Sequence, residues 1–217
     1  MTANAGGPTA RRGGAAGPGA RATAREAAIL AAATERFMRY GFRRTSLEDI
    51  AREAGLARPS LYLRFRNKEE IFRAVAAGLH ERALRAAEAA ANGPGSIEAR
   101  LGAVLEAKLA SCFEIAHGSP HAGELMDENN RICGDVSERA RRRLLGLVRR
   151  VIESAVATGE LAPARVALAP AAAALLVVDA ARGLETMGPE RPTPARYRAR
   201  LAQLVRVLVA GLGGSPA

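Results

Sequence analysis

A short segment near residue 60 carries side chains well suited to binding an anionic partner. Arg58, Ser60, Tyr62 and Arg64 share the polar side of this segment, opposite the apolar Leu61. Such groups donate hydrogen bonds to phosphates or to the edges of nucleic-acid bases. The alternative is a helical hairpin whose polar face is simply solvated, which is the commoner outcome of such a pattern.

A second group of chemically capable residues lies between positions 112 and 124. It comprises Cys112, Glu114, His117, His121 and Glu124. His117 and His121 have the spacing of two metal ligands on one helix, but Gly118 and Pro120 between them argue against a continuous helix. Three interpretations stay open: a metal site, a ligand pocket of mixed polarity, or ordinary packing between helices. The pocket candidates are Cys112, Phe113, His117, His121 and Glu124.

Motifs of common enzyme classes are missing from the sequence. It contains no phosphate-binding GxxxxGK loop, no GxSxG, no HExxH and no CxxC. We therefore expect no catalytic activity, no metal and no cofactor.

The segment near residue 60 must be positioned by short helices. Ser46 and Asp49 form a capping-box pattern at the start of one helix, and Gly55 suits its end. A second helix begins near Arg58, where Pro59 fits the first turn. Two short helices joined by a tight turn containing Gly are a helix-turn-helix unit.

The excess of positive charge is concentrated around this unit. Residues 1–68 carry 13 Lys and Arg against 5 Asp and Glu, whereas the other 149 residues carry 19 against 17. Most of the formal net charge of +10 therefore lies near the motif, as a surface that binds a polyanion requires.

The segment GFRRTSLEDIAREAGLARPSLYLRFRNKEEIF resembles the DNA-binding signature of TetR/AcrR-type transcriptional regulators. The matching positions are Gly41, Phe42, Thr45, Ile50, Ala51, Ala54, Gly55, Leu61, Tyr62, Phe65, Lys68 and Glu69. Ala57 departs from the Ser cap that is frequent in the family, a loss of ~1 kcal/mol for the recognition helix.

The helix-turn-helix interpretation assigns two kinds of DNA contact. Arg58, Ser60 and Leu63 are candidates for base edges or thymine methyls, and Thr45, Tyr62, Arg64 and Lys68 for phosphates. The resemblance supports Tyr62 and Lys68 in particular. The full predicted DNA-binding set is Arg43, Arg44, Thr45, Arg58, Pro59, Ser60, Tyr62, Leu63, Arg64 and Lys68.

The whole chain is predicted to be all-α, with about nine helices. We expect a disordered basic arm over 1–22, a three-helix DNA-binding domain over 23–70, and a helical domain for ligand binding and dimerisation over 71–213. The helices are expected near 23–40, 46–54, 58–64, 67–91, 96–117, 121–132, 135–155, 166–187 and 194–212. The arm either stays loose or follows the phosphates and minor groove of DNA.

Apolar stripes on the last two helices predict a homodimer. The stripe of the final helix would expose much apolar surface in a monomer, and a two-fold contact removes it. The resemblance implies the same contact, a four-helix bundle from the last two helices of each subunit. The interface candidates are Leu175, Val178, Leu201, Leu204, Val205 and Leu208.

These features predict a cytoplasmic, sequence-specific transcriptional regulator, most often a repressor. Its partners would be a palindromic operator in double-stranded DNA, a second copy of the chain, and a small, largely apolar effector that causes release from DNA. No signal peptide or apolar run long enough to span a membrane is present, and two cysteines make no disulfide framework. The alternatives are a helical ligand carrier or enzyme with a basic anion-binding head, and a nucleoid-type protein without sequence preference.

Overall fold

The computed structural model describes residues 18–184 and 193–213, with the side chains of 18–21 and 109–117 left out of the description. Within these residues the chain is entirely helical, with eight α-helices, one 3-10 helix and no strand. The predicted all-α class is confirmed. The first 17 residues of the predicted arm lie outside the described part, and its last five residues begin the first helix, α1 (Pro18–Tyr40).

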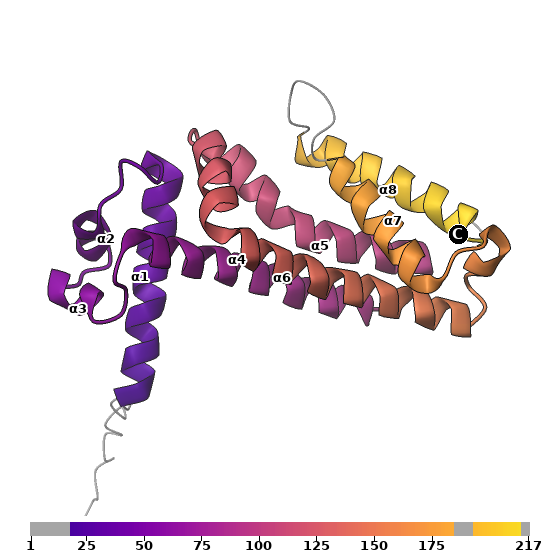
Figure 1. Ribbon diagram of the computed structural model, residues 1–217, viewed down its shortest axis with the longest axis horizontal. Coiled ribbons are helices and arrows are strands. Elements are labelled where there is room, and N and C mark those ends of the chain that lie inside the picture. The colour runs from indigo at the N-terminus through magenta and orange to yellow at the C-terminus, as the bar shows by residue number, and fades with distance from the viewer. Residues whose placement is uncertain (1–17, 185–192, 214–217) are drawn as a thin grey trace, which may run out of the picture.

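Three helices form a small head at one end of the molecule (Figure 1). They are α1, α2 (Leu47–Glu53) and α3 (Arg58–Tyr62). Ser46 and Asp49 make the predicted capping box on α2, and Gly55 takes a positive φ of 65° in the turn to α3. Ala57 makes no side-chain cap, and Pro59 lies in the first turn of α3.

The head has its own apolar core. Phe37, Phe42 and Phe72 pack with ring centroids 5.1–5.6 Å apart, and Ile29, Ile50, Leu61 and Ile71 are fully buried beside them. Gly41, with a φ of 82°, ends α1 and turns Phe42 back into this core.

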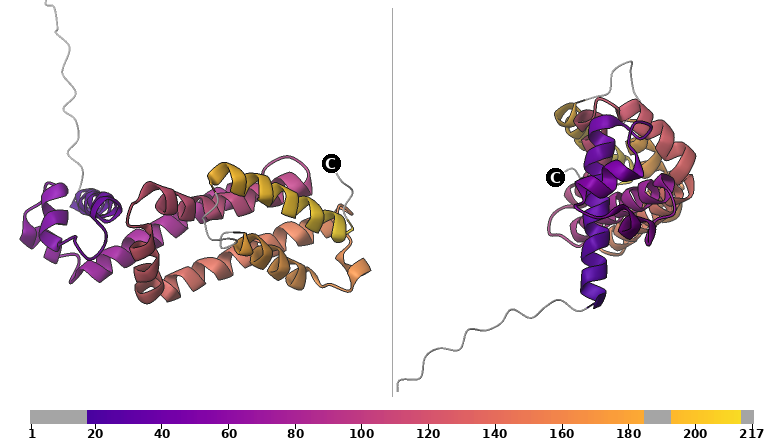
Figure 2. Two further views of the ribbon diagram at one scale, coloured as in Figure 1. Left: turned by 90° about the horizontal axis from the view of Figure 1, so that it is seen from above. Right: turned by 90° about the vertical axis from the view of Figure 1, so that its left-hand side faces the viewer.

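The long helix α4 (Lys68–Ala91) runs from the head into a bundle of four further helices (Figures 1 and 2). These are α5 (Ile97–Gly118), α6 (Ala122–Ala157), α7 (Pro170–Gly183) and α8 (Pro194–Gly211), with a 3-10 helix at Pro163–Val166 before α7. Asn67 caps α4, since its side-chain oxygen accepts a hydrogen bond from the amide of Glu70.

The helix α6 is kinked where the sequence predicted a break between two helices. The helices expected over 121–132 and 135–155 follow one another without a loop, and the non-helical backbone angles at Cys133 form the kink between them. The part before the kink belongs to the core of the head through Leu125 and Ile132, and the part after it belongs to the bundle core from Ala140 onward. Thus α4 and α6 each contribute to both cores.

The apolar stripe of α8 faces in another direction than the sequence predicted. Leu201 and Val205 are 2% and 3% exposed because they face inward, together with Val178 of α7, in the core of the same chain. These three residues are therefore unsuited to a contact between subunits. The exposed apolar side chains here are Leu175, Leu176 and Val207, and Leu204 and Leu208 are partly buried.

Among the described residues, no helix combines the length and apolar character needed to cross a membrane.

Candidate functional site

The recognition segment α3 is anchored on one side and exposed on the other. Leu61 is fully buried and Phe65, just after the helix, is 8% exposed, so both hold α3 against the head. On the opposite side, Arg58, Pro59 and Tyr62 are exposed. Leu63 is 87% exposed, an unusual position for a leucine unless it meets a partner.

Arg58 is held in place by weak, exposed contacts. Its guanidinium lies 2.6 Å from the Glu48 carboxylate, donates to the Tyr62 hydroxyl at 3.1 Å, and stacks 5.3 Å from the centre of the Tyr62 ring. Since exposed ion pairs contribute little, a base edge or phosphate can replace Glu48 at small cost. Arg58 and Tyr62 therefore act as one hydrogen-bonding unit on the outer face of α3.

The other α3 candidates are less accessible. Ser60 is half-buried, and Arg64 is half-buried and lies 3.2 Å from the Glu26 carboxylate of α1. By contrast, the two arginines in the loop after α1, Arg43 and Arg44, are both exposed.

Two predicted phosphate contacts instead close the loop between α1 and α2. The Lys68 ammonium donates to the carbonyl oxygens of Phe42, Thr45 and Arg43 at 2.7, 2.8 and 3.3 Å. These three bonds use all the protons that a lysine can donate, so none is left for a phosphate. Burial lowers the pKa of Lys68 below its usual value.

Thr45 is likewise turned inward. Its side chain is 1% exposed, and its hydroxyl donates to the Gly41 carbonyl at 2.7 Å. Buried polar groups are costly unless they are hydrogen-bonded, and both Thr45 and Lys68 satisfy that condition inside the protein. These two residues therefore position Arg43 and Arg44 and do not themselves reach outward.

The head is fastened to the first part of α6 by polar contacts. Glu124 accepts from the backbone amide of Arg43 at 2.7 Å, and Glu128 lies 3.4 Å from the Arg43 guanidinium. Arg131 pairs with Glu128 at 2.7 Å and with Glu69 of α4 at 2.9 Å. The hydrogen bond from Arg131 lowers the pKa of Glu128, which stays ionised at neutral pH.

The kink of α6 is clamped to α4. Arg73 binds both carboxylate oxygens of Asp135, at 2.7 and 2.8 Å, and also donates to the Ile132 carbonyl. This contact lowers the pKa of Asp135 to about 2. A bidentate arginine–carboxylate pair fixes orientation as well as distance, so α4 and α6 are tied at this point.

The residues proposed for a ligand pocket fall in two places. The side chains of Cys112, Phe113 and His117 lie outside the described residues. His121 and Glu124 lie at the start of α6, where the Glu124 carboxylate contacts Gly41 and Arg43 of the head. In the described part of the chain, no three His, Cys, Asp or Glu side chains come together in a way that could hold a metal.

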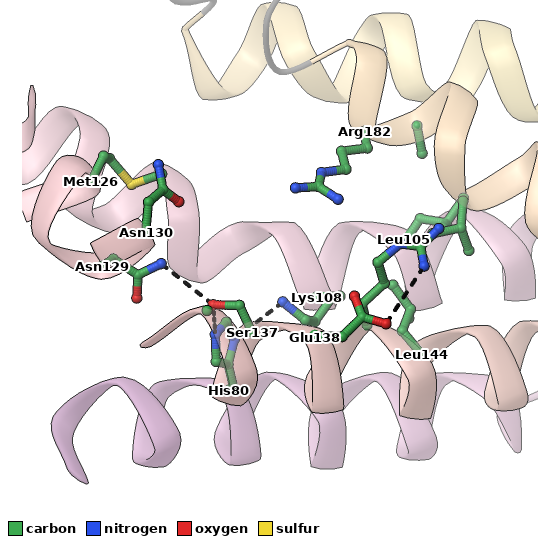
Figure 3. Close-up of a pocket in the computed structure, with 14 residues that line it drawn as sticks. His80, Leu105, Lys108, Met126, Asn129, Asn130, Ser137, Glu138, Leu144 and Arg182 are labelled. Carbon is green, nitrogen blue, oxygen red and sulfur yellow. Dashed lines mark hydrogen bonds and ion pairs between the residues drawn. The ribbon is translucent and has the colours of Figure 1, made fainter. Parts of the chain in front are cut away.

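The bundle contains a cavity of about 320 Å³ between α4, α5, α6 and α7 (Figure 3). Its apolar lining includes Leu105, Met126, Leu144, Val178 and Ala181. Its polar lining comprises His80, Lys108, Asn129, Asn130, Ser137, Glu138, Arg141 and Arg182. The sequence assigned none of these polar residues to a pocket, because they come from four helices and share no local spacing.

A hydrogen-bonded chain of polar groups lines one end of this cavity (Figure 3). The Lys108 ammonium lies 3.3 Å from Nδ1 of His80, and Nε2 of His80 lies 3.4 Å from the Ser137 hydroxyl, which also accepts from Asn129 at 3.4 Å. Burial and the charge of Lys108 lower the pKa of His80 to about 4. The imidazole is therefore neutral at pH 7, with Nδ1 as the acceptor from Lys108 and Nε2–H as the donor to Ser137.

Comparison with known proteins identifies the head. Residues 29–75 match the family described as bacterial regulatory proteins, tetR family. Over 55 residues the chain is 44% identical to the transcriptional regulator TtgR of Pseudomonas putida, covering 25% of this chain and 26% of TtgR. The matched segment thus spans about a quarter of the length of the curated relatives.

Solved structures extend the similarity to the bundle. A TetR/AcrR-family regulator from Thermobifida fusca is 26% identical, with a TM-score of 0.61 over 87% of this chain and 98% of that one. SmeT, the repressor of the Stenotrophomonas maltophilia efflux pump SmeDEF, shares the fold at 22% identity, with a TM-score of 0.59 over 85% and 88% of the two chains. Residues 29–75 therefore form a DNA-binding domain of the tetR family, and the chain as a whole shares the fold of TetR/AcrR-family regulators.

Proposed function

We propose that the protein is a homodimeric transcriptional repressor that binds a palindromic operator and is released by a small molecule. The observation that carries the proposal is the outer face of α3, where Arg58, Tyr62 and Leu63 project away from a head that is otherwise well packed. An exposed leucine beside hydrogen-bond donors suits a major groove, which presents thymine methyls beside base-edge acceptors.

Each subunit would lay α3 in a major groove, with the exposed Arg43 and Arg44 near the phosphates. Two heads related by a two-fold axis would occupy half-sites roughly 34–36 Å apart, one turn of DNA, or somewhat more. Such a role requires the compartment that holds the DNA, which we propose is the cytoplasm.

The dimer contact would use the outward surfaces of α7 and α8. Leu175, Leu176 and Val207 are exposed there, and Leu204 and Leu208 are partly accessible. Burying this surface against a second copy would remove apolar area from water.

Effector release would pass through the first part of α6. Met126, Asn129 and Asn130 line the cavity, whereas Leu125, Glu128 and Ile132 on the same segment contact the head or its core. A ligand that prefers one position of this segment would shift the heads between two spacings, only one of which fits the operator. The complex of SmeT with triclosan supports a small-molecule partner for this fold.

A footprint on the promoter region upstream of the protein's own gene tests the proposal. Protection of a palindrome by the purified protein, absent on a scrambled duplex of equal length, is the expected result. Binding of both duplexes with equal affinity would instead favour a nucleoid-type protein, and absence of binding would favour a ligand carrier.

A further inference from the structure

The cavity in the bundle carries an excess of positive charge. Among its described lining residues, Lys108, Arg141 and Arg182 are cationic and only Glu138 is anionic, a formal net charge of +2 with His80 neutral. The sequence predicted a largely apolar effector, but this lining favours a ligand that brings negative charge.

The three cations are not equivalent. Arg141 lies 3.2 Å from Asp179 and 4.0 Å from Glu138, so its charge is already balanced by the protein. Lys108 is only 8% exposed, and the neutral imidazole of His80 accepts a hydrogen bond from its ammonium. The Arg182 side chain makes no hydrogen bond or ion pair with any residue that the structure describes, and Figure 3 shows it extending from α7 on the side of the cavity across from Lys108.

The polar end also presents donors more than acceptors. The Ser137 hydroxyl accepts from His80 and Asn129, which leaves its own proton to donate. Leu105 and Leu144 lie away from this end (Figure 3), and Val178 is also part of the apolar lining. The volume of about 320 Å³ lies at the lower limit of small-molecule sites.

We propose that this cavity binds a small organic carboxylate, with its anionic head between Lys108 and Arg182 and a compact apolar body against Leu105, Leu144 and Val178. The carboxylate is a monoanion, because the Glu138 side chain in the same lining disfavours a second negative charge. Its role as an effector rests on the proposed function, but binding of the anion to the free protein does not require DNA.

Matched pairs of probes separate charge from shape. Benzoate and octanoate are compared with the neutral benzamide and octanamide, each titrated into the full-length protein without DNA. Because the chain contains no tryptophan, binding is followed by titration calorimetry and by the shift in Tm in differential scanning calorimetry. At least one carboxylate should bind, and its amide partner should bind roughly tenfold or more weakly.

Four variants locate the site. Lys108→Met and Arg182→Met should each weaken carboxylate binding by roughly tenfold, whereas Arg182→Lys should retain most of it. Arg150→Met removes an equal charge from the exposed surface of α6, outside the cavity, and should leave binding unchanged. Lys108→Met preserves side-chain volume, and Arg182→Met changes an exposed position, so both variants should fold.

Equal binding of amides and carboxylates, insensitivity to both methionine variants, or no binding of any carboxylate probe would each overturn the inference. A parallel gel shift on the operator separates the two proposals. Carboxylate binding that depends on Arg182 but leaves the DNA complex intact would support the site and contradict its role in release. If the unliganded protein does not bind the operator, that result would contradict the proposed function but not the carboxylate site.

Discussion

At the scale of single residues, two polar side chains that resemble DNA contacts in the sequence serve the head instead. Lys68 joins α4 to three carbonyls of the loop after α1, and Thr45 returns to Gly41 in the same loop. Arg43 and Arg44 are presented by this loop and remain exposed. Residue type alone does not show whether such a side chain bonds to the protein or to DNA, since a backbone carbonyl and a phosphate accept hydrogen bonds from the same donors.

Lys68→Met should therefore lower the free energy of unfolding by ~1–3 kcal/mol, because it leaves three carbonyls of the loop without their donor. Arg44→Ala is the matched control, since its exposed side chain should matter for DNA affinity and not for stability. Chemical denaturation followed by circular dichroism measures both. An unchanged unfolding free energy in Lys68→Met would contradict the structural role of the ammonium.

Arg58→Ala should relax base preference, costing ~1–3 kcal/mol on the operator and little on random duplex. Tyr62→Phe, which removes the hydroxyl but keeps the ring, should weaken binding to both duplexes alike. Salt titrations of affinity on the two duplexes provide the measurement. A uniform loss in Arg58→Ala would refute its base-reading role.

At the scale of helices, the polar chain of the half-buried His80 and Ser137 and the buried Lys108 joins α4, α5 and α6. The folded protein keeps His80 neutral down to a pKa of about 4, whereas an unfolded histidine titrates near 6.5. Between pH 4 and pH 6.5 the unfolded chain therefore binds a proton at His80 that the folded protein does not bind. Acidification through this window therefore favours unfolding.

We expect stability to fall by roughly 2 kcal/mol from this group as pH drops from 6.5 to 4, allowing for its partial exposure. The Asp135 carboxylate, with its pKa of about 2, contributes stability that is lost only below that range, as the pH falls from 3.8 to about 2. The dependence of Tm on pH between 4 and 6.5 should therefore be weaker in His80→Gln than in the unmodified protein, and should be unchanged in the control His121→Gln. An equally steep profile in His80→Gln would assign the effect to other groups.

Sequence patterns predicted the head helices well because their signals are local. Ser46, Gly55 and Asn67 mark helix ends within a few residues of where they form. The inward direction of the α8 stripe was not predictable, since Leu201 packs on helices distant in sequence. The cavity was missed for the same reason: Lys108 is an ordinary helix residue until three other helices surround it.

At the scale of the molecule, α4 and α6 connect two apolar cores. Both helices contribute side chains to the head core and to the bundle core. In the proposed mechanism, a displacement of either helix at the cavity would move the head, since packed cores deform little. A second copy joined through α7 and α8 would set the distance between the two heads.

Val207→Glu should weaken the proposed dimer by ~2 kcal/mol or more, since the interface would desolvate two like charges. Val166→Glu is the control, because this residue of the 3-10 helix is similarly exposed, at 49% against 68% for Val207, but lies on another element. Sedimentation velocity over a concentration series measures both. A dimer as tight in Val207→Glu as in the control would exclude the α8 surface as the contact.

The chain has only two lysines, and they occupy very different places: Lys68 under the loop of the head and Lys108 in the cavity of the bundle. Because the chain has no other lysine, amine-directed reagents have only these two side-chain targets besides the chain's terminal amine. Mass spectrometry after mild acetylation would thus follow the opening of the head loop and the occupancy of the cavity in one sample, with no residue substituted.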